Sequence, residues 1–176
     1  MRAFVEAMGE LGDYYHDQYG DGNRDVIAPL TAEEANLLHA RQLARANDWW
    51  GVVITTMQGL RQLYSHTGRR AEWARLVNEI VPDFVDPATD GPLPGREEEW
   101  RLVIEYRSRL AQEARQWGEA ERLQRLKVEW ARRRAAPALA LPPEALDDAQ
   151  RNAIRSLAAS LHDLEQIPIE CTHSFR

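Results

Sequence analysis

The stretch that decides the fold runs from Trp49 to Phe84 and reads WWGVVITTMQGLRQLYSHTGRRAEWARLVNEIVPDF. Its hydrophobic residues recur every three or four positions, first over 49–67 and again over 70–84, which is the spacing of one face of an α-helix. Gly68 separates the two segments, and a glycine after the last apolar turn is typical of a helix end. The stretch therefore predicts two amphipathic helices joined by a short turn.

Other parts of the chain repeat this theme. Gly12-Asp13-Tyr14-Tyr15 near the N-terminus and Trp117-Gly118-Glu119-Ala120 in the second half are variations of the residues around Gly68. Helical spacing of apolar residues also recurs over 2–19, 32–46, 97–116 and 117–135. A single pair of amphipathic helices cannot bury all of its apolar surface, so it must pack against a neighbouring pair. The repetition predicts a stack of helix pairs, and no segment alternates strictly as a strand would.

The ends and connections of these helices have their own signals. Thr31 followed by Glu34 predicts a capping box at the start of the 32–46 helix. Residues 85–95 contain three prolines and two glycines, so they are expected to form an irregular loop inserted between helix pairs. Residues 137–143 are expected to be a spacer before a last helix, which starts at Pro142-Pro143 and breaks near Asp147.

Composition narrows the class of protein. The chain has 176 residues, of which 44% are hydrophobic, and this is enough to fold without a metal or a disulfide. The net charge of −6 argues against a nucleic-acid partner. The strongest basic cluster, Arg132-Arg133-Arg134, has two interpretations, a solvated helix end or a nucleic-acid patch, and the first is favoured because the cluster closes a helix rich in Glu and Arg.

The cysteine content and the absence of targeting signals indicate the cellular compartment. A single cysteine, Cys171, allows no internal disulfide, which fits a reducing compartment. No long apolar stretch and no secretion signal are visible, so we expect a cytoplasmic protein without a membrane partner. Cys171 and His173 are the one pair that resembles metal ligands, but zinc needs three or four ligands. We therefore predict no metal and no cofactor.

No catalytic motif is legible. The sequence has no glycine-rich phosphate loop, no Gly-x-Ser-x-Gly elbow and no His-Glu-x-x-His pair. The acidic run Glu97-Glu98-Glu99 opens a helix, where the helix dipole favours negative charge. Six tryptophans against three phenylalanines suit the gaps between stacked helix pairs better than ligand stacking. We therefore expect a protein that is not an enzyme.

The chain resembles the tetratricopeptide-repeat family, whose two-helix unit has a spaced Leu, Tyr and Gly in its first helix and a small residue in its second. Leu60, Tyr64 and Gly68 occupy three of these positions, and Trp73 stands where the family has a small residue. The C-terminal pair offers Val103, Tyr106, Leu110, Ala114 and Ala120. The spacing departs from the family: 38 residues separate Ala35 from Trp73 and 47 separate Trp73 from Ala120, against about 34 in the family.

The resemblance implies an all-α fold of antiparallel helix pairs stacked in a right-handed TPR-like superhelix, an α-solenoid. One such domain is expected over 1–166, with about three helix pairs and an unpaired last helix, followed by an irregular tail over 167–176. It also implies a module that binds a protein or peptide segment in a concave groove. Arrays of this kind are often part of larger scaffold or regulatory proteins, bacterial signalling proteins among them, so the chain is interpreted as a fragment of one.

The groove residues are predicted from the first helix of each of the two helix pairs that resemble the family most clearly. The six candidates for binding a partner are Gln58, Gln62 and His66 on the 49–67 helix, and Arg101, Ser108 and Gln112 on the 97–116 helix. An alternative is that the 85–95 loop projects from the repeat junction and is itself the binding element. A second, different function stays open: a structural or self-assembly segment that forms homo-oligomers by packing through its exposed terminal repeats.

Overall fold

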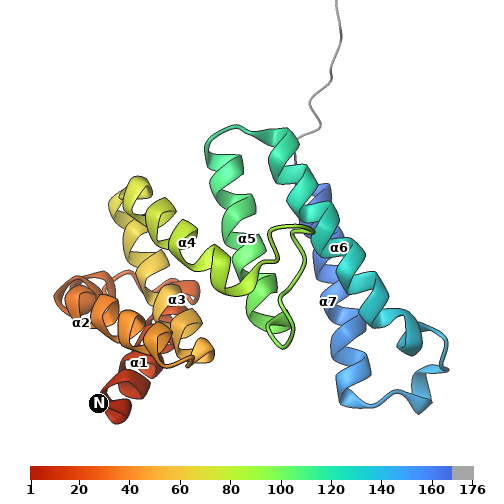
Figure 1. Ribbon diagram of the computed structural model, residues 1–176, viewed down its shortest axis with the longest axis horizontal. Coiled ribbons are helices and arrows are strands. Elements are labelled where there is room, and N and C mark those ends of the chain that lie inside the picture. The colour runs from red at the N-terminus through yellow and green to blue at the C-terminus, as the bar shows by residue number, and fades with distance from the viewer. Residues whose placement is uncertain (168–176) are drawn as a thin grey trace, which may run out of the picture. The chain divides into compact units, whose positions relative to one another are not determined.

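The computed structural model of the protein describes residues 1–167 and is almost entirely helical (Figure 1). Within that range there are seven α-helices, one 3-10 turn and no strand, and helix accounts for 80% of the structure. The α-helices are α1 (Arg2–Gly20), α2 (Ile27–Ala46), α3 (Trp50–Thr67), α4 (Arg70–Phe84), α5 (Glu97–Glu113), α6 (Trp117–Leu139) and α7 (Asp148–Glu165). The prediction of an all-α protein is confirmed.

Two predicted helix boundaries were wrong for local reasons. α2 begins at Ile27 rather than after Thr31, because Pro29 falls in the first turn, where a helix needs no backbone N–H. Thr31 is therefore no cap, and its hydroxyl donates to the Ile27 carbonyl at 2.7 Å. α6 continues through Pro137 to Leu139, so the spacer that was predicted to begin at this proline is shorter.

The last helix was predicted to start at Pro142-Pro143 and to break near Asp147; the chain does break there, but α7 itself starts only at Asp148. A 3-10 turn, Pro143–Ala145, precedes it, and Asp147 then caps the new helix. The Asp147 carboxylate accepts from the Gln150 backbone N–H at 2.7 Å, and the Gln150 side chain accepts from the Asp147 N–H at 2.9 Å. This reciprocal capping box satisfies two N–H groups that no helix bond can reach.

The chain folds as two compact units, residues 1–80 and residues from 81 onward, with the boundary inside α4. The first contains α1, α2, α3 and most of α4, and the second contains α5, α6 and α7. The single array over 1–166 stays a prediction.

In the first unit, glycines let α1 and α3 approach closely. A Cβ atom on Gly12 would lie 2.5 Å from the Thr55 carbonyl oxygen, and one on Gly59 would lie 2.9 Å from the Gly12 Cα. Only a residue without a side chain fits at such a crossing. Gly12 is thus a contact residue in the middle of the helix that was predicted over 2–19.

Buried polar groups join α2 to α3 and α4. Arg41 is 1% exposed, and its Nη2 donates to Glu79 Oε2 at 2.8 Å and to the Leu76 carbonyl at 3.1 Å. Glu34 accepts from Tyr64 and from Arg69, both at 2.7 Å. Burying a charged group costs free energy, and pairing with an opposite charge offsets much of that cost.

In the second unit, α6 packs against both α5 and α7. The Trp100 ring of α5 lies 5.5 Å from the Trp130 ring of α6. Ile167, which follows α7, is 6% exposed and packs with Ala111 and Ala120. Ile167, the first residue of the predicted tail over 167–176, therefore belongs to the core. Residues 168–176, with Cys171 and His173, lie outside the described residues.

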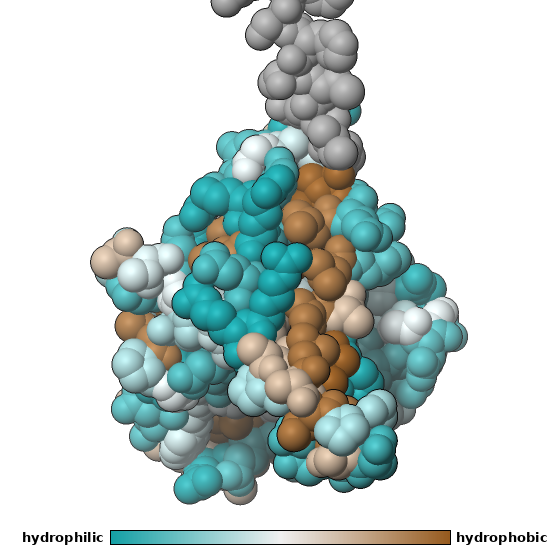
Figure 2. Space-filling view, turned by 90° about the vertical axis from the view of Figure 1, so that its right-hand side faces the viewer, coloured by the Kyte–Doolittle hydropathy of each residue, from teal (hydrophilic) through white to brown (hydrophobic). Residues whose placement is uncertain are grey.

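The last helix buries its small residues and leaves its large ones half covered. Ala153 and Ser160 are buried in α7, whereas Ile154, Leu157, Leu161 and Leu164 are only half-buried. Leu139 and Leu141, just before α7, are 59% and 41% exposed. Figure 2 shows a band of hydrophobic surface flanked by hydrophilic residues on the side where α6 and α7 lie in Figure 1. α7 thus keeps an incompletely covered apolar face.

Candidate functional site

Two polar cavities lie in the second unit between α6 and its neighbours α5 and α7, and together they are called the trough. The upper cavity, of about 490 Å³, lies toward the C-terminal end of α6, and the lower cavity, of about 240 Å³, lies toward its N-terminal end. The upper cavity is lined by Glu98, Arg134, Ala149, Asn152, Ala153, Arg155 and Ser156, and the lower one by Glu105, Arg109, Gln112, Gln124, Asp163 and Gln166. Both therefore draw residues from all three helices or their immediate ends.

A buried lysine ties α6 to both α5 and α7. The Lys127 side chain is 3% exposed, and its Nζ lies 2.7 Å from Asp163 Oδ2 on α7 and 3.9 Å from Glu105 Oε2 on α5. Glu105 also pairs with Arg109 at 3.0 Å. An ammonium removed from water is costly unless carboxylates face it, so these charges hold the three helices in register.

Gln124 lies one helical turn before Lys127 and lines the lower cavity. The residue is 3% exposed, and its side-chain Oε1 is buried without a hydrogen-bond partner in the protein. A buried acceptor left unpaired costs about 1–3 kcal/mol. Such an atom is normally matched by a donor from water or from a bound molecule.

The upper cavity is polar and already paired. Arg134 of α6 forms an ion pair with Glu98 of α5. On α7, the Arg155 guanidinium donates to Asn152 Oδ1 at 2.7 Å. The exposed Asn152 and the half-buried Ser156 offer further hydrogen-bonding atoms at this end of the trough.

The three candidates predicted on α5 have different positions. Gln112 lines the lower cavity, and its Nε2 donates to Ser108 Oγ at 3.4 Å. Ser108 itself is 0% exposed and donates to the Ala120 carbonyl at 3.4 Å, so it offers no surface to a partner. Arg101 is half-buried and is not among the residues that line either cavity.

The three candidates predicted on α3 belong to the first unit, where α1 lies against them. The Gln62 amide nitrogen is 2.6 Å from His16 Nδ1. His66 Nδ1 lies 3.3 Å from the Tyr19 hydroxyl, and the two rings meet edge to face at 6.0 Å. Gln58 is half-buried and also has an interaction within the protein. Their role in binding a partner stays a prediction.

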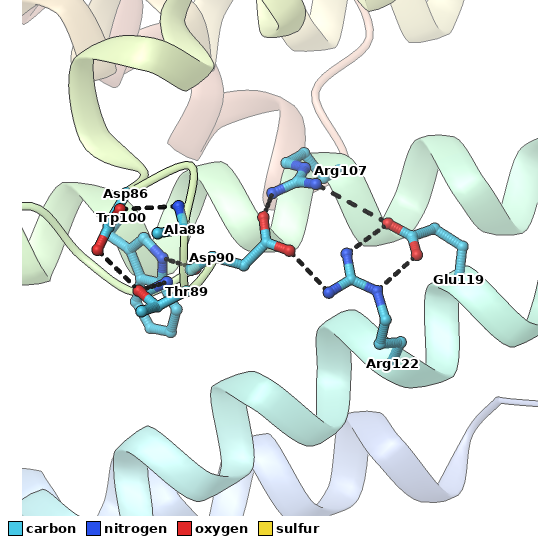
Figure 3. A network of polar contacts seen from close by, with 9 residues as sticks. Asp86, Ala88, Thr89, Asp90, Trp100, Arg107, Glu119 and Arg122 are labelled. Carbon is cyan, nitrogen blue, oxygen red and sulfur yellow. Dashed lines mark hydrogen bonds and ion pairs between the residues drawn. The ribbon is translucent and has the colours of Figure 1, made fainter.

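The 85–96 loop, between α4 and α5, is fixed through Asp90 (Figure 3). The Asp90 carboxylate accepts from Arg107 of α5 at 3.0 Å and from Arg122 of α6 at 2.7 Å. The Trp100 indole N–H donates to the Asp90 carbonyl at 2.8 Å. Glu119 completes the network, because it accepts from Arg122 at 2.7 Å and 2.9 Å.

Bonds within the loop close it into a compact turn. Asp86 accepts from the Ala88 N–H and from the Thr89 hydroxyl, both at 2.9 Å, and its own N–H donates to the Gly91 carbonyl at 2.9 Å (Figure 3). Asp90 has a φ of +56°, a strained value for a residue with a side chain. The expectation that the loop projects from the repeat junction is therefore wrong, since the loop is bound to α5 and α6.

These networks shift the acidity of their carboxylates. Burial raises the pKa of Asp90, but hydrogen bonds from Arg107 and Arg122 outweigh it, so that the pKa lies below its ordinary value. The hydrogen bond from Arg69 holds the pKa of Glu34 below its ordinary value, against the effect of burial. Both groups are therefore carboxylates at neutral pH.

Sequence reasoning missed Gln124, Lys127 and Asp163. One signal was available, because Ala120, Gln124, Lys127 and Ala131 follow each other at three- and four-residue steps and so share one helix face. Two long polar residues between two alanines on an inward face predict a polar contact with another helix. The partner of Lys127, Asp163, is 36 positions away, and local spacing cannot identify it.

Comparisons with known proteins add no identity to this geometry. No model of a protein family matches the chain, and neither a curated protein nor a solved structure matches it. Among residues 1–167 no group of three or more His, Cys, Asp or Glu side chains is placed to hold a metal ion. In the same part of the chain no helix combines the length and the apolar character needed to cross a membrane.

Proposed function

We propose that this protein is an interaction module, a TPR-like α-solenoid segment that binds a polar stretch of a partner protein in the trough of its second unit. The observation that carries the proposal is the pair of cavities between α5, α6 and α7. In repeats of this kind, the first helix of each helix pair lines a common groove. Here α5 would be the first helix of one pair, α6 its second helix, and α7 the first helix of the next pair.

Charge and polarity favour a hydrogen-bonding segment as the ligand. Acidic and basic side chains alternate along the trough, and most are paired within the protein: Glu98 with Arg134, Glu105 with Arg109, and Lys127 with Asp163. Such a surface has little net charge to attract phosphates or a strongly charged peptide. It keeps amide and hydroxyl groups for hydrogen bonds to a neutral chain.

The proposal is tested with two variants of neighbouring residues on α7. Asn152→Trp places a large ring at the exposed edge of the upper cavity, whereas Arg151→Trp places the same ring on an exposed position that lines neither cavity. Peptides are selected from a random display library on the purified chain. Their affinity for Asn152→Trp is expected to fall at least about tenfold, the scale of a blocked central contact, and their affinity for Arg151→Trp is expected to stay unchanged.

Two outcomes would contradict the trough as binding surface. One is that the library yields no peptide with saturable binding, and the other is that both variants bind the selected peptides as the natural chain does. Circular dichroism of both variants checks that each retains its helical content.

A second candidate function, self-assembly, is favoured by the half-covered apolar face of α7 together with Leu139 and Leu141. A second copy of the chain could cover that face, since exposed apolar patches favour association. Light scattering over a range of concentrations separates the two functions. A molecular mass that rises with concentration, and that Leu139→Glu reduces to the monomer, would favour self-assembly.

A further inference from the structure

α7 has an apolar stripe that its own unit covers only in part. The stripe consists of four large aliphatic residues, all half-buried: Ile154, Leu157, Leu161 and Leu164. Steps of three and four residues place them along one side of the helix. Leu164 also packs against the core around Ile167. None of the four lines either cavity of the trough, so the stripe is a surface separate from the proposed peptide site.

The other side of α7 explains why the stripe is left over. α7 packs against α6, and the residues it buries are the small Ala153 and Ser160. Small residues fill the contact between the two helices, and the large aliphatic side chains lie beside it. Burial of apolar surface contributes about 25 cal/mol per Å². A further helix on the stripe would therefore gain stability from surface that α6 leaves exposed.

The stripe is matched in shape to a second copy of itself. Its steps of three, four and three residues read the same from both ends. In an antiparallel pair of α7 helices, Ile154 therefore lies opposite Leu164 of the second copy, and Leu157 lies opposite Leu161 of the second copy. The four residues alternate between heptad positions a and d, which form the seam between paired helices. A two-fold axis through the middle of the stripe would repeat every contact.

The charges beside the stripe favour the antiparallel orientation. Arg151 and Glu165 are exposed and lie at the two ends of the stripe, both at heptad position e, with the small Ala158 between them. In an antiparallel pair, Arg151 of each copy comes beside Glu165 of the other. A parallel pair would bring two arginines together at one end and two glutamates at the other. Within its own chain, Arg151 pairs only with Asp148, which is 94% exposed, and such a pair contributes little.

We infer that α7 pairs with α7 of a second copy in an antiparallel, two-fold contact that is closed at both ends by Arg151 and Glu165. The inference rests on self-assembly, the second candidate function, and supplies its surface, orientation and residue pairs. It is independent of peptide binding in the trough. The stripe covers only about three turns of helix, so the contact is small and the dissociation constant should lie in the micromolar range.

The test is sedimentation equilibrium of the full chain over a range of concentrations, with variants that exchange charges. Arg151→Glu and Glu165→Arg each place like charges at both ends of the antiparallel contact. The double variant restores opposite charges, and so does a mixture of equal amounts of the two single variants. Arg133→Glu is the matched control, because it makes the same change of charge at an exposed position of α6 that pairs with Glu129 of the same helix.

We expect a reversible dimer of the natural chain. Each single variant should dimerise at least about fivefold more weakly, because two attractive charge pairs become repulsive. The double variant and the mixture should regain the dissociation constant of the natural chain, and Arg133→Glu should keep it. Leu161→Glu, at the middle of the stripe, should leave only the monomer, and circular dichroism checks that its helices are retained.

Three outcomes would overturn the inference. If the natural chain is monomeric at every concentration, self-assembly falls with it, and the stripe is left for a helix of another protein. If the chain associates but Arg151→Glu and Glu165→Arg do so equally well, only the pairing of α7 is refuted, and self-assembly through another surface stands. If the single variants are weakened but neither the double variant nor the mixture recovers, the antiparallel orientation is wrong. The peptide selection on the trough is unaffected by all three.

Discussion

Replacing Gly12 by alanine should push α1 away from α3. The added Cβ would lie 2.5 Å from the Thr55 carbonyl oxygen and 3.2 Å from the Thr56 Cα, whereas non-bonded heavy atoms rest at about 3.5–4.0 Å. Both neighbours are backbone atoms of a helix, so no side chain can rotate aside. Overpacking of this kind costs about 1–3 kcal/mol, and alanine returns up to about 1 kcal/mol as the better helix former. We expect a net loss of about 1–2 kcal/mol.

The measurement is urea unfolding followed by circular dichroism, with Gly51→Ala as the control. Gly51 also lies in a helix, α3, but a Cβ there would meet nothing within 4 Å. That variant should be neutral or more stable by up to about 1 kcal/mol. Equal midpoints for the two variants would refute the reasoning, because they would mean that α1 and α3 do not cross at Gly12.

Three further predictions concern Trp73, Arg41 and Asp90. Trp73 is 6% exposed, and Trp73→Ala should lower the free energy of unfolding by about 3–5 kcal/mol. A decrease below about 1 kcal/mol in urea unfolding would contradict the burial of this ring. Arg41→Ala should cost about 2–5 kcal/mol in the same assay, because it leaves a cavity and removes the donor of Glu79 and of the Leu76 carbonyl, whereas Arg2→Ala, at an exposed pair, should cost almost nothing. Asp90→Asn should cost about 1–3 kcal/mol at neutral pH. The pKa of Asp90 is lowered in the folded chain, so its contribution to stability is present above the unfolded pKa of about 4 and disappears as the pH falls below it. The unfolding free energies of the natural chain and of Asp90→Asn should therefore converge at low pH. A difference that stays constant down to low pH would disprove this role.

Periodicity predicted the helices well because each amphipathic stripe is a local property of the sequence. The segment 70–84 has the bounds of α4, and the start at Glu97 is that of α5. The errors fall where a local signal has two possible meanings. Pro137 can end a helix or sit in its last turn, and Thr31 can cap a helix or lie within one. The local sequence alone does not decide between the two.

The candidate site could be predicted only in part. Gln112 lines the lower cavity, whereas Ser108, which was predicted for the same groove, is buried. The helix face of Gln58, Gln62 and His66 is in contact with α1, which no spacing within α3 can reveal. Asp90 looked like one polar residue of a loop, and its two arginines come from separate helices.

α6 is the element on which both polar features of the second unit depend. Arg122, on its first turns, binds the loop through Asp90, and Lys127, just over one turn later, binds α7 through Asp163. The loop network fixes α6 to α5 by four charged groups, whereas α6 packs along α7 and the Lys127–Asp163 pair lies within that contact. Loss of Asp163 would leave the buried Lys127 ammonium facing only the more distant Glu105, so the contact between α6 and α7 depends on this pair as well as on packing.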